Sequence, residues 1–145
     1  MEPTHRLSRA IMSLRRAAHL ARCAQNDKRM ILTISRAAFA TSDESLKIDL
    51  LRLLVGVEWP TASRLLHFCD ERPYPILDYR ALWSLGHAKT PHYTMEFWLE
   101  YLACTRGLTT RLKHDIRTIA RALWQYSKRV CAGHFSMANS AAPAC

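Results

Sequence analysis

The sequence predicts an all-α protein, for reasons that lie in its composition. Only four glycines and six prolines interrupt its 145 residues. The β-branched residues that favour strands form no clusters, whereas Ala, Leu and Arg, which favour helices, dominate the chain. A chain of this length is sufficient for one compact domain and short for two. We therefore expect a compact helical bundle, formed by a single domain over residues 1–132.

Three helices are expected in the N-terminal third. Apolar residues recur every three or four positions through residues 4–24, with arginines mostly off that stripe, as in an amphipathic helix. A second helix is predicted over residues 28–40 and a third over residues 43–54. Thr41 and Glu44 have the three-residue spacing of a capping box, whose side chains bond to backbone N–H groups where a helix begins.

The middle of the chain predicts two helices separated by a surface loop. Pro60 suits the first turn of a helix, because its missing N–H would have no partner there, so a fourth helix is expected from Pro60 to about Cys69. The prolines of the following "DERPYP" bar helix, and its two acidic residues place that loop at the surface. Asp78 then opens a fifth helix, which ends near Gly86.

The C-terminal third predicts two further helices and a tail. A sixth helix is expected over residues 94–105, and Gly107 would end it in a left-handed conformation. Over residues 112–130 apolar residues alternate at spacings of four and three, with basic residues between them, which is the clearest amphipathic pattern in the chain. Residues 133–145 have no periodicity and are expected to form a disordered tail.

The distribution of charge favours a polyanionic partner. The net charge of +9 divides into +5 over residues 1–30, −2 over residues 31–100 and +6 over residues 101–145. Basic side chains placed against phosphates release condensed counterions, so two basic arms around a mildly acidic middle suit DNA. The same charge would also serve solubility alone.

Cysteine and hydropathy patterns bear on location and cofactors. The five cysteines are odd in number, widely spaced and form no C-x-x-C pair, which fits a reducing compartment without disulfides. No apolar run is long enough to span a bilayer. We expect a cytoplasmic protein, nucleoid-associated if bacterial, that does not enter a membrane. The histidines and cysteines lack the spacing of a metal site, so neither a metal nor another cofactor is expected.

One stretch carries a more specific signal. The segment "LVGVEWPTASRLLHF", followed by an aspartate 22 residues after Gly56, resembles the hairpin and catalytic aspartate of the helix-hairpin-helix DNA glycosylase superfamily, the endonuclease III-like proteins. The resemblance covers about residues 45–85 and implies a central helix-hairpin-helix over about residues 43–70. The residues that match the family's hairpin pattern are Leu54, Gly56, Val57, Thr61 and Ala62.

The resemblance implies a DNA-binding protein that hydrolyses the N-glycosidic bond of a damaged or modified base. Asp78 would be the catalytic carboxylate, which stabilises the positive charge that builds on deoxyribose as the base departs or activates water. Pro60 stands where bifunctional members have a lysine nucleophile, which implies hydrolysis without strand cleavage. The residues expected to contact DNA are Gly56, Val57, Trp59, Thr61, Arg80, Arg117 and Arg121. The aromatic residues expected to line the pocket for a flipped base are Tyr74, Tyr79 and Trp83.

Other interpretations remain open. Asp78 would also be a good N-cap without any catalytic role, and Arg80 would pair with Asp78 or be solvated if it meets no phosphate. Tryptophans within amphipathic helices, Trp83, Trp98 and Trp124, are more often core residues than stacking platforms. Glu58 replaces a glycine of the hairpin and brings a negative charge near the expected phosphate. The alternatives to a glycosylase are a non-catalytic helix-hairpin-helix nucleic-acid-binding module and a helical protein whose basic arms meet an acidic protein. The sequence does not indicate an oligomeric state.

Overall fold

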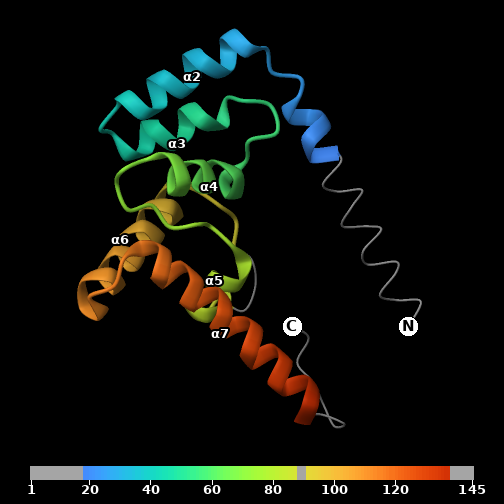
Figure 1. The fold of residues 1–145 in the computed structure, drawn as a ribbon, viewed down its shortest axis with the longest axis vertical. Helices are drawn as coiled ribbons and strands as arrows, with labels where there is room; N and C mark the ends of the chain where they lie inside the picture. Colours follow the sequence, from blue (N-terminus) through green and yellow to red (C-terminus); the bar gives the residue numbers. More distant parts are fainter. Residues whose placement is uncertain (1–17, 88–90, 138–145) are drawn as a thin grey trace. The chain divides into compact units, whose positions relative to one another are not determined.

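A computed structural model describes residues 18–87 and 91–137, and within these ranges the chain is helical with no strand (Figure 1). The prediction of an all-α fold is therefore confirmed for the described residues. A helical segment at residues 18–23 precedes the labelled helices, which are α2 (Lys28–Ala40), α3 (Glu44–Arg52), α4 (Trp59–Cys69), α5 (Tyr79–Ser84), α6 (Met95–Leu112) and α7 (Ile116–Met137). Residues 4–17 of the predicted 4–24 helix lie outside the described residues, and residue 24 already belongs to the following turn.

The chain divides into two compact units, Met1–Ala62 and Ser63–Cys145, with the boundary inside α4. In the first unit α2 packs against α3 (Figure 1). Apolar side chains at helical spacing form the contact between these two helices, because each turns one stripe inward. The buried apolar residues of these two helices are Ile34, Ala38, Ile48 and Leu51.

The two helices of the first unit begin at aspartates. The carboxylates of Asp27 and Asp43 accept hydrogen bonds from the backbone N–H groups three residues on, each at 2.9 Å. The predicted capping box, with Thr41 as the N-cap of α3, is therefore wrong. Thr41 instead closes α2, since its backbone N–H donates to Ala37 O, and its hydroxyl accepts a hydrogen bond from the Asp43 N–H.

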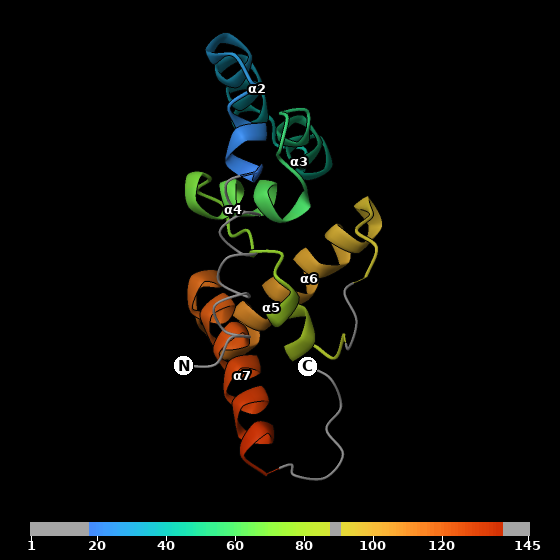
Figure 2. The same cartoon turned by 90° about the vertical axis from the view of Figure 1, so that its right-hand side faces the viewer.

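The second unit is held together by α5 and α6, which both pack on α7 (Figure 2). Its core includes Trp98, which is fully buried and lies parallel to the ring of Tyr74 at 6.4 Å between centroids. Side chains also fasten the loop between α4 and α5, because Ser63 Oγ accepts from the Leu77 N–H at 2.9 Å and the Tyr101 hydroxyl donates to Ile76 O at 2.8 Å. This loop ends at Asp78, directly before α5.

Burial decides the ionisation of Tyr101. The pKa of its phenol is raised far above the ordinary value, mainly by desolvation and secondarily by the charge of Asp78. The hydroxyl therefore stays protonated and continues to donate to Ile76 O.

The boundary between α6 and α7 lies further along the chain than the sequence predicted. Gly107 does not end α6, because the helix continues to Leu112 and stops where Lys113 adopts a left-handed conformation with φ of 53°. The expectation that Gly107 is a stop was wrong, since a glycine permits that conformation without requiring it. Helix α7 extends to Met137, so residues 133–137 of the predicted disordered tail are helical, and the remainder of that tail lies outside the described residues.

The start of α7 gives a pH-dependent prediction. Asp115 accepts hydrogen bonds from the backbone N–H and the hydroxyl of Thr118, and these bonds lower its pKa. A lowered pKa stabilises the fold above the unfolded-state pKa, and that contribution is lost as the pH falls through the folded-state pKa. Asp115→Asn keeps the cap without the charge. We expect the urea midpoint of the wild type to exceed that of Asp115→Asn slightly at pH 6, and the two to converge as the pH falls through the folded-state pKa of Asp115. A gap that does not change with pH would contradict this.

Candidate functional site

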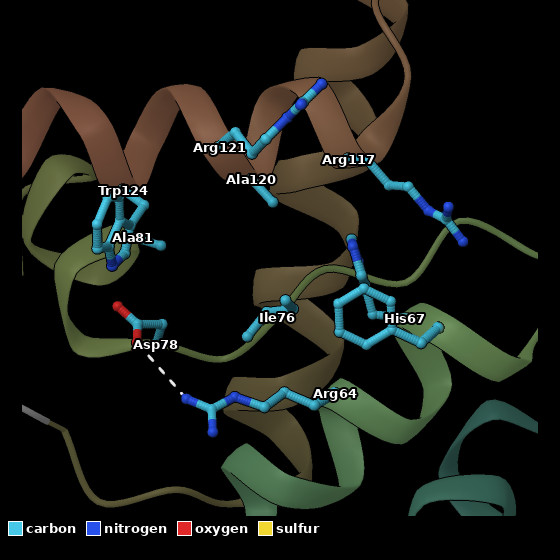
Figure 3. A pocket seen from close by; sticks show the side chains of 10 residues that line it. Arg64, His67, Ile76, Asp78, Ala81, Arg117, Ala120, Arg121 and Trp124 are labelled. Atoms are coloured by element: carbon cyan, nitrogen blue, oxygen red, sulfur yellow. Dashed lines mark ion pairs between the residues drawn. The ribbon is translucent and has the colours of Figure 1, made fainter.

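A cavity of about 580 Å³ opens beside Asp78, entirely within the second unit (Figure 3). Its wall is formed by α4, the following loop, α5 and α7, and most of it is apolar. The lining residues are Arg64, His67, Phe68, Ile76, Asp78, Ala81, Arg117, Ala120, Arg121 and Trp124. A cavity of this size is comparable with sites for small organic ligands.

Asp78 is the N-cap of α5, as the sequence predicted. Its backbone is extended, with φ of −129° and ψ of 139°, and its Oδ1 accepts a hydrogen bond from the Arg80 N–H at 2.8 Å. Arg64 reaches from α4 toward the carboxylate, with its Nη2 4.0 Å from Asp78 Oδ2 (Figure 3). The Asp78 side chain keeps 20% of its surface exposed. The carboxylate is thus fixed in place and still accessible from the cavity.

The cavity has more positive than negative charge around it. Arg64, Arg117 and Arg121 belong to its lining and are exposed, whereas Asp78 is the one carboxylate among the described residues that line it. Guanidinium groups match phosphate geometry well, so this rim suits a phosphorylated ligand. His67 takes a different role, because it is buried and its Nδ1 donates to Tyr74 O at 2.7 Å.

The aromatic residues in the wall differ from those expected. None of the three residues predicted for the base pocket lines the cavity. Tyr74 is fully buried in the core, Tyr79 is 56% exposed outside the cavity, and Trp83 packs on Tyr126 with 6.4 Å between ring centroids. Trp124 takes the place expected for them: it lines the cavity and is 40% exposed, so its expected role as a core residue is wrong.

The guanidinium of Arg80, the other arginine expected at the site, lies against aromatic rings. Its guanidinium lies 5.2 Å from the ring centroid of Tyr79 and 5.9 Å from that of Trp124. Its backbone N–H donates to Asp78 Oδ1. Arg80 is therefore neither fully solvated nor paired with the Asp78 carboxylate through its side chain.

The turn before α4, expected to hold a phosphate, is covered by the chain of its own unit. Gly56 has φ of +84° and lies against Cys23, so closely that a Cβ there would come within 2.8 Å of Cys23 Sγ. The Val55 N–H donates to Asn26 Oδ1 at 2.8 Å, and the Val57 N–H donates to Leu54 O at 3.0 Å. Gly56 and Val57 are both buried. These groups are not open to a phosphate, and a helix-hairpin-helix is not shown.

The flanking residues of that turn are also engaged. Trp59 is only 8% exposed and lies under the guanidinium of Arg52, 3.9 Å from the ring centroid, so its ring does not face solvent as a contact for DNA would. Thr61 Oγ1 lies 3.2 Å from His19 Nε2. Glu58 forms an exposed ion pair with Arg22 at 3.6 Å. Residues 19–26 thus occupy the surface on which the sequence placed the DNA backbone.

A second hollow of about 640 Å³ lies on the same unit and shares His67 and Arg117 with the first. Its lining mixes charges, with acidic residues such as Asp70 and Asp115 beside Arg72. Among the residues that the structure describes, no group of three or more His, Cys, Asp or Glu side chains is arranged to hold a metal ion.

No protein-family model, curated protein or solved structure matches this chain. Within the described ranges, no helix is both long and apolar enough to cross a membrane.

Proposed function

We propose that the protein binds DNA and hydrolyses the N-glycosidic bond of a damaged or modified base held in the Asp78 cavity. The observation that supports this is the position of one fixed carboxylate in the wall of a mostly apolar cavity with arginines around it. The resemblance of the 45–85 segment to helix-hairpin-helix glycosylases suggests the reaction. The cavity adds a space in which that reaction would take place.

The residues of the cavity have distinct roles in this proposal. Trp124 offers an exposed ring on which a base stacks, and stacking tolerates any base because every base has an aromatic face. Arg117 and Arg121 bind the phosphates that flank the nucleotide. Asp78 then faces the sugar: as the N-glycosidic bond breaks, the base leaves with the bonding electron pair, and the carboxylate stabilises the sugar cation. Water adds to that cation to give the abasic sugar hydroxyl, and its proton passes to the departing base.

Arg64 has a part in the same reaction. In the free protein its guanidinium lies near Asp78 Oδ2, so each charge partly offsets the other. A phosphate bound by Arg64 draws that guanidinium away and leaves the carboxylate with its full effect on the developing cation. The side chain of Arg64 is 56% exposed, which leaves it free to make this exchange.

A second candidate is a nucleic-acid-binding protein without catalysis. The observation that favours it is that Asp78 Oδ1 and Oδ2 have protein neighbours already, the Arg80 N–H and Arg64. In that case the carboxylate stabilises α5 and orients Arg64, and the cavity serves only to hold a base.

The test is an assay of base release. Oligonucleotides that each carry one uracil, 8-oxoguanine, alkylated purine or hydroxymethylated cytosine, both single-stranded and in duplexes, are incubated with the protein and then heated in alkali, which cleaves at abasic sites. We expect release of one of these bases and no strand cleavage before alkali, because Pro60 offers no amine nucleophile. Salt-sensitive binding without release from any substrate would refute the enzymatic proposal and support the second candidate.

A further inference from the structure

Four neighbouring residues outside and at the edge of the cavity form what we call the cation–aromatic strip: Tyr79, Arg80, Trp124 and Lys128. Arg80 lies between the two rings, 5.2 Å from the centroid of Tyr79 and 5.9 Å from that of Trp124. Lys128 Nζ lies 5.0 Å from the same Trp124 ring. Tyr79 is 56% and Trp124 40% exposed, so both rings are accessible to a ligand.

We propose that this strip binds single-stranded DNA, so that single strands rather than duplexes are the preferred substrate. The inference rests on the proposed function and names its substrate class. Exposed aromatic rings interleaved with cations are the features that hold a single strand, since bases stack on the rings and the cations meet phosphates. In a duplex the base faces are stacked on one another and are not free to meet Tyr79 or Trp124.

Trp124 connects the strip with the cavity. It lines the cavity and also receives both cations of the strip, Arg80 and Lys128. A strand that places one nucleotide beside Asp78 therefore has its next nucleotide at Tyr79 and Arg80, without any need to bend a duplex or extrude a base from it.

The first unit supports the same choice of substrate. A turn that grips a duplex backbone needs exposed N–H groups. Around Gly56 the N–H groups of Val55 and Val57 donate hydrogen bonds to other groups of the protein. The turn that would hold a duplex backbone is therefore not accessible, whereas the aromatic rings of the strip, which would hold a single strand, are exposed.

The experiment compares binding of one labelled 12-nucleotide sequence as a single strand and as a blunt duplex, by fluorescence anisotropy at two salt concentrations. We expect the single strand to bind at least about 10-fold more tightly. Trp124→Leu is expected to weaken single-strand binding by roughly 5- to 150-fold, the range for losing one stacked base, and Trp124→Phe to weaken it much less. Tyr126→Leu is the matched control, because Tyr126 is an exposed aromatic residue of α7 outside the strip and the cavity, and binding should not change.

A charge variant tests the strip independently of the fold around Trp124. Lys128→Gln should reduce the slope of log affinity against log salt for the single strand by about one ion. Duplex binding that equals or exceeds single-strand binding, or equal losses from Trp124→Leu and Tyr126→Leu, would overturn the inference. Base release from a duplex in either case would leave the proposed function standing, whereas failure of both DNA forms to bind would refute that function itself.

Discussion

Asp78→Asn is expected to slow base release by at least about 100-fold while the protein still folds and binds DNA. A carboxylate that acts as a base or stabilises a developing cation contributes roughly 10²- to 10⁴-fold to the rate, and the neutral amide supplies neither effect. The cap is retained, because asparagine is as good an N-cap as aspartate and its side-chain oxygen accepts from the Arg80 N–H. The rate is measured under single-turnover conditions with protein in excess, so that binding does not limit it.

A matched variant separates chemistry from loss of charge. Asp43→Asn makes the same change at another N-cap, where the carboxylate accepts from the Leu46 N–H in the first unit, far from the cavity lining in the sequence. Its base release should equal that of the wild type. Equal slowing of both variants would assign the effect to net charge, and full activity in Asp78→Asn would remove Asp78 from the reaction.

The binding measurement gives a further distinction. With the negative charge of Asp78 gone, Arg64 no longer has an opposite charge 4.0 Å away and is free to meet phosphate. Asp78→Asn should therefore bind DNA as tightly as the wild type or slightly more tightly. Much weaker binding would indicate that the Asp78 carboxylate positions Arg64, which is the role that the non-catalytic candidate gives it.

Local signals in the sequence predicted the local structure well. The helix predicted over residues 28–40 matches α2, and Asp78, which follows a proline-rich loop, is the N-cap of α5 as predicted. Two local signals were compatible with more than one structure. Thr41 and Asp43 both suit an N-cap, and Gly107 permits a helix end as well as a helix interior.

The cavity could not be predicted in the same way, because its wall comes from parts of the chain that are distant in sequence. Asp78 lies near Arg64 of α4 and shares the lining with Trp124 of α7. A local sequence pattern does not indicate which face of α4 or of α7 turns toward the loop that carries Asp78. Tyr74 shows the same limit: its position beside Asp78 in the sequence suggested a shared pocket, but stacking on Trp98 places it in the core.

The turn before α4 shows how an identical local pattern leads to another environment. The "L-x-G-V" stretch folds into a turn in which Gly56 is left-handed, and Asn26 bonds to both the N–H and the carbonyl of Val55. Those two bonds are made across 29 residues of sequence. The surface of a turn depends on which distant segment packs on it, and this is information that the pattern itself does not hold.

Gly56→Ala tests that packing and is expected to destabilise the first unit by about 2–4 kcal/mol. A left-handed conformation costs a non-glycine residue about 1 kcal/mol or more, and forcing an additional methyl group into a packed site costs about 1–3 kcal/mol. Both terms apply here, since φ is +84° and the new Cβ would lie 2.8 Å from Cys23 Sγ and 3.0 Å from Cys23 N. A backbone atom cannot move aside as the end of a side chain can. Urea unfolding monitored by circular dichroism measures the loss.

Two other glycines separate the two terms. Gly86→Ala has φ of +97° and open space around the new Cβ, so it should lose only the conformational part, about 1 kcal/mol. Gly107→Ala lies inside α6 with nothing within 4 Å and should stabilise the protein by about 0.5–1 kcal/mol, because alanine favours a helix interior over glycine. In Gly56→Ala the displaced segment should also make Cys23 react faster with a thiol reagent, while Cys69 and Cys104, already exposed, react as before. Equal losses from Gly56→Ala and Gly86→Ala, with no change at Cys23, would show that residues 22 and 23 do not pack on the turn, and the turn would then be open to a phosphate after all.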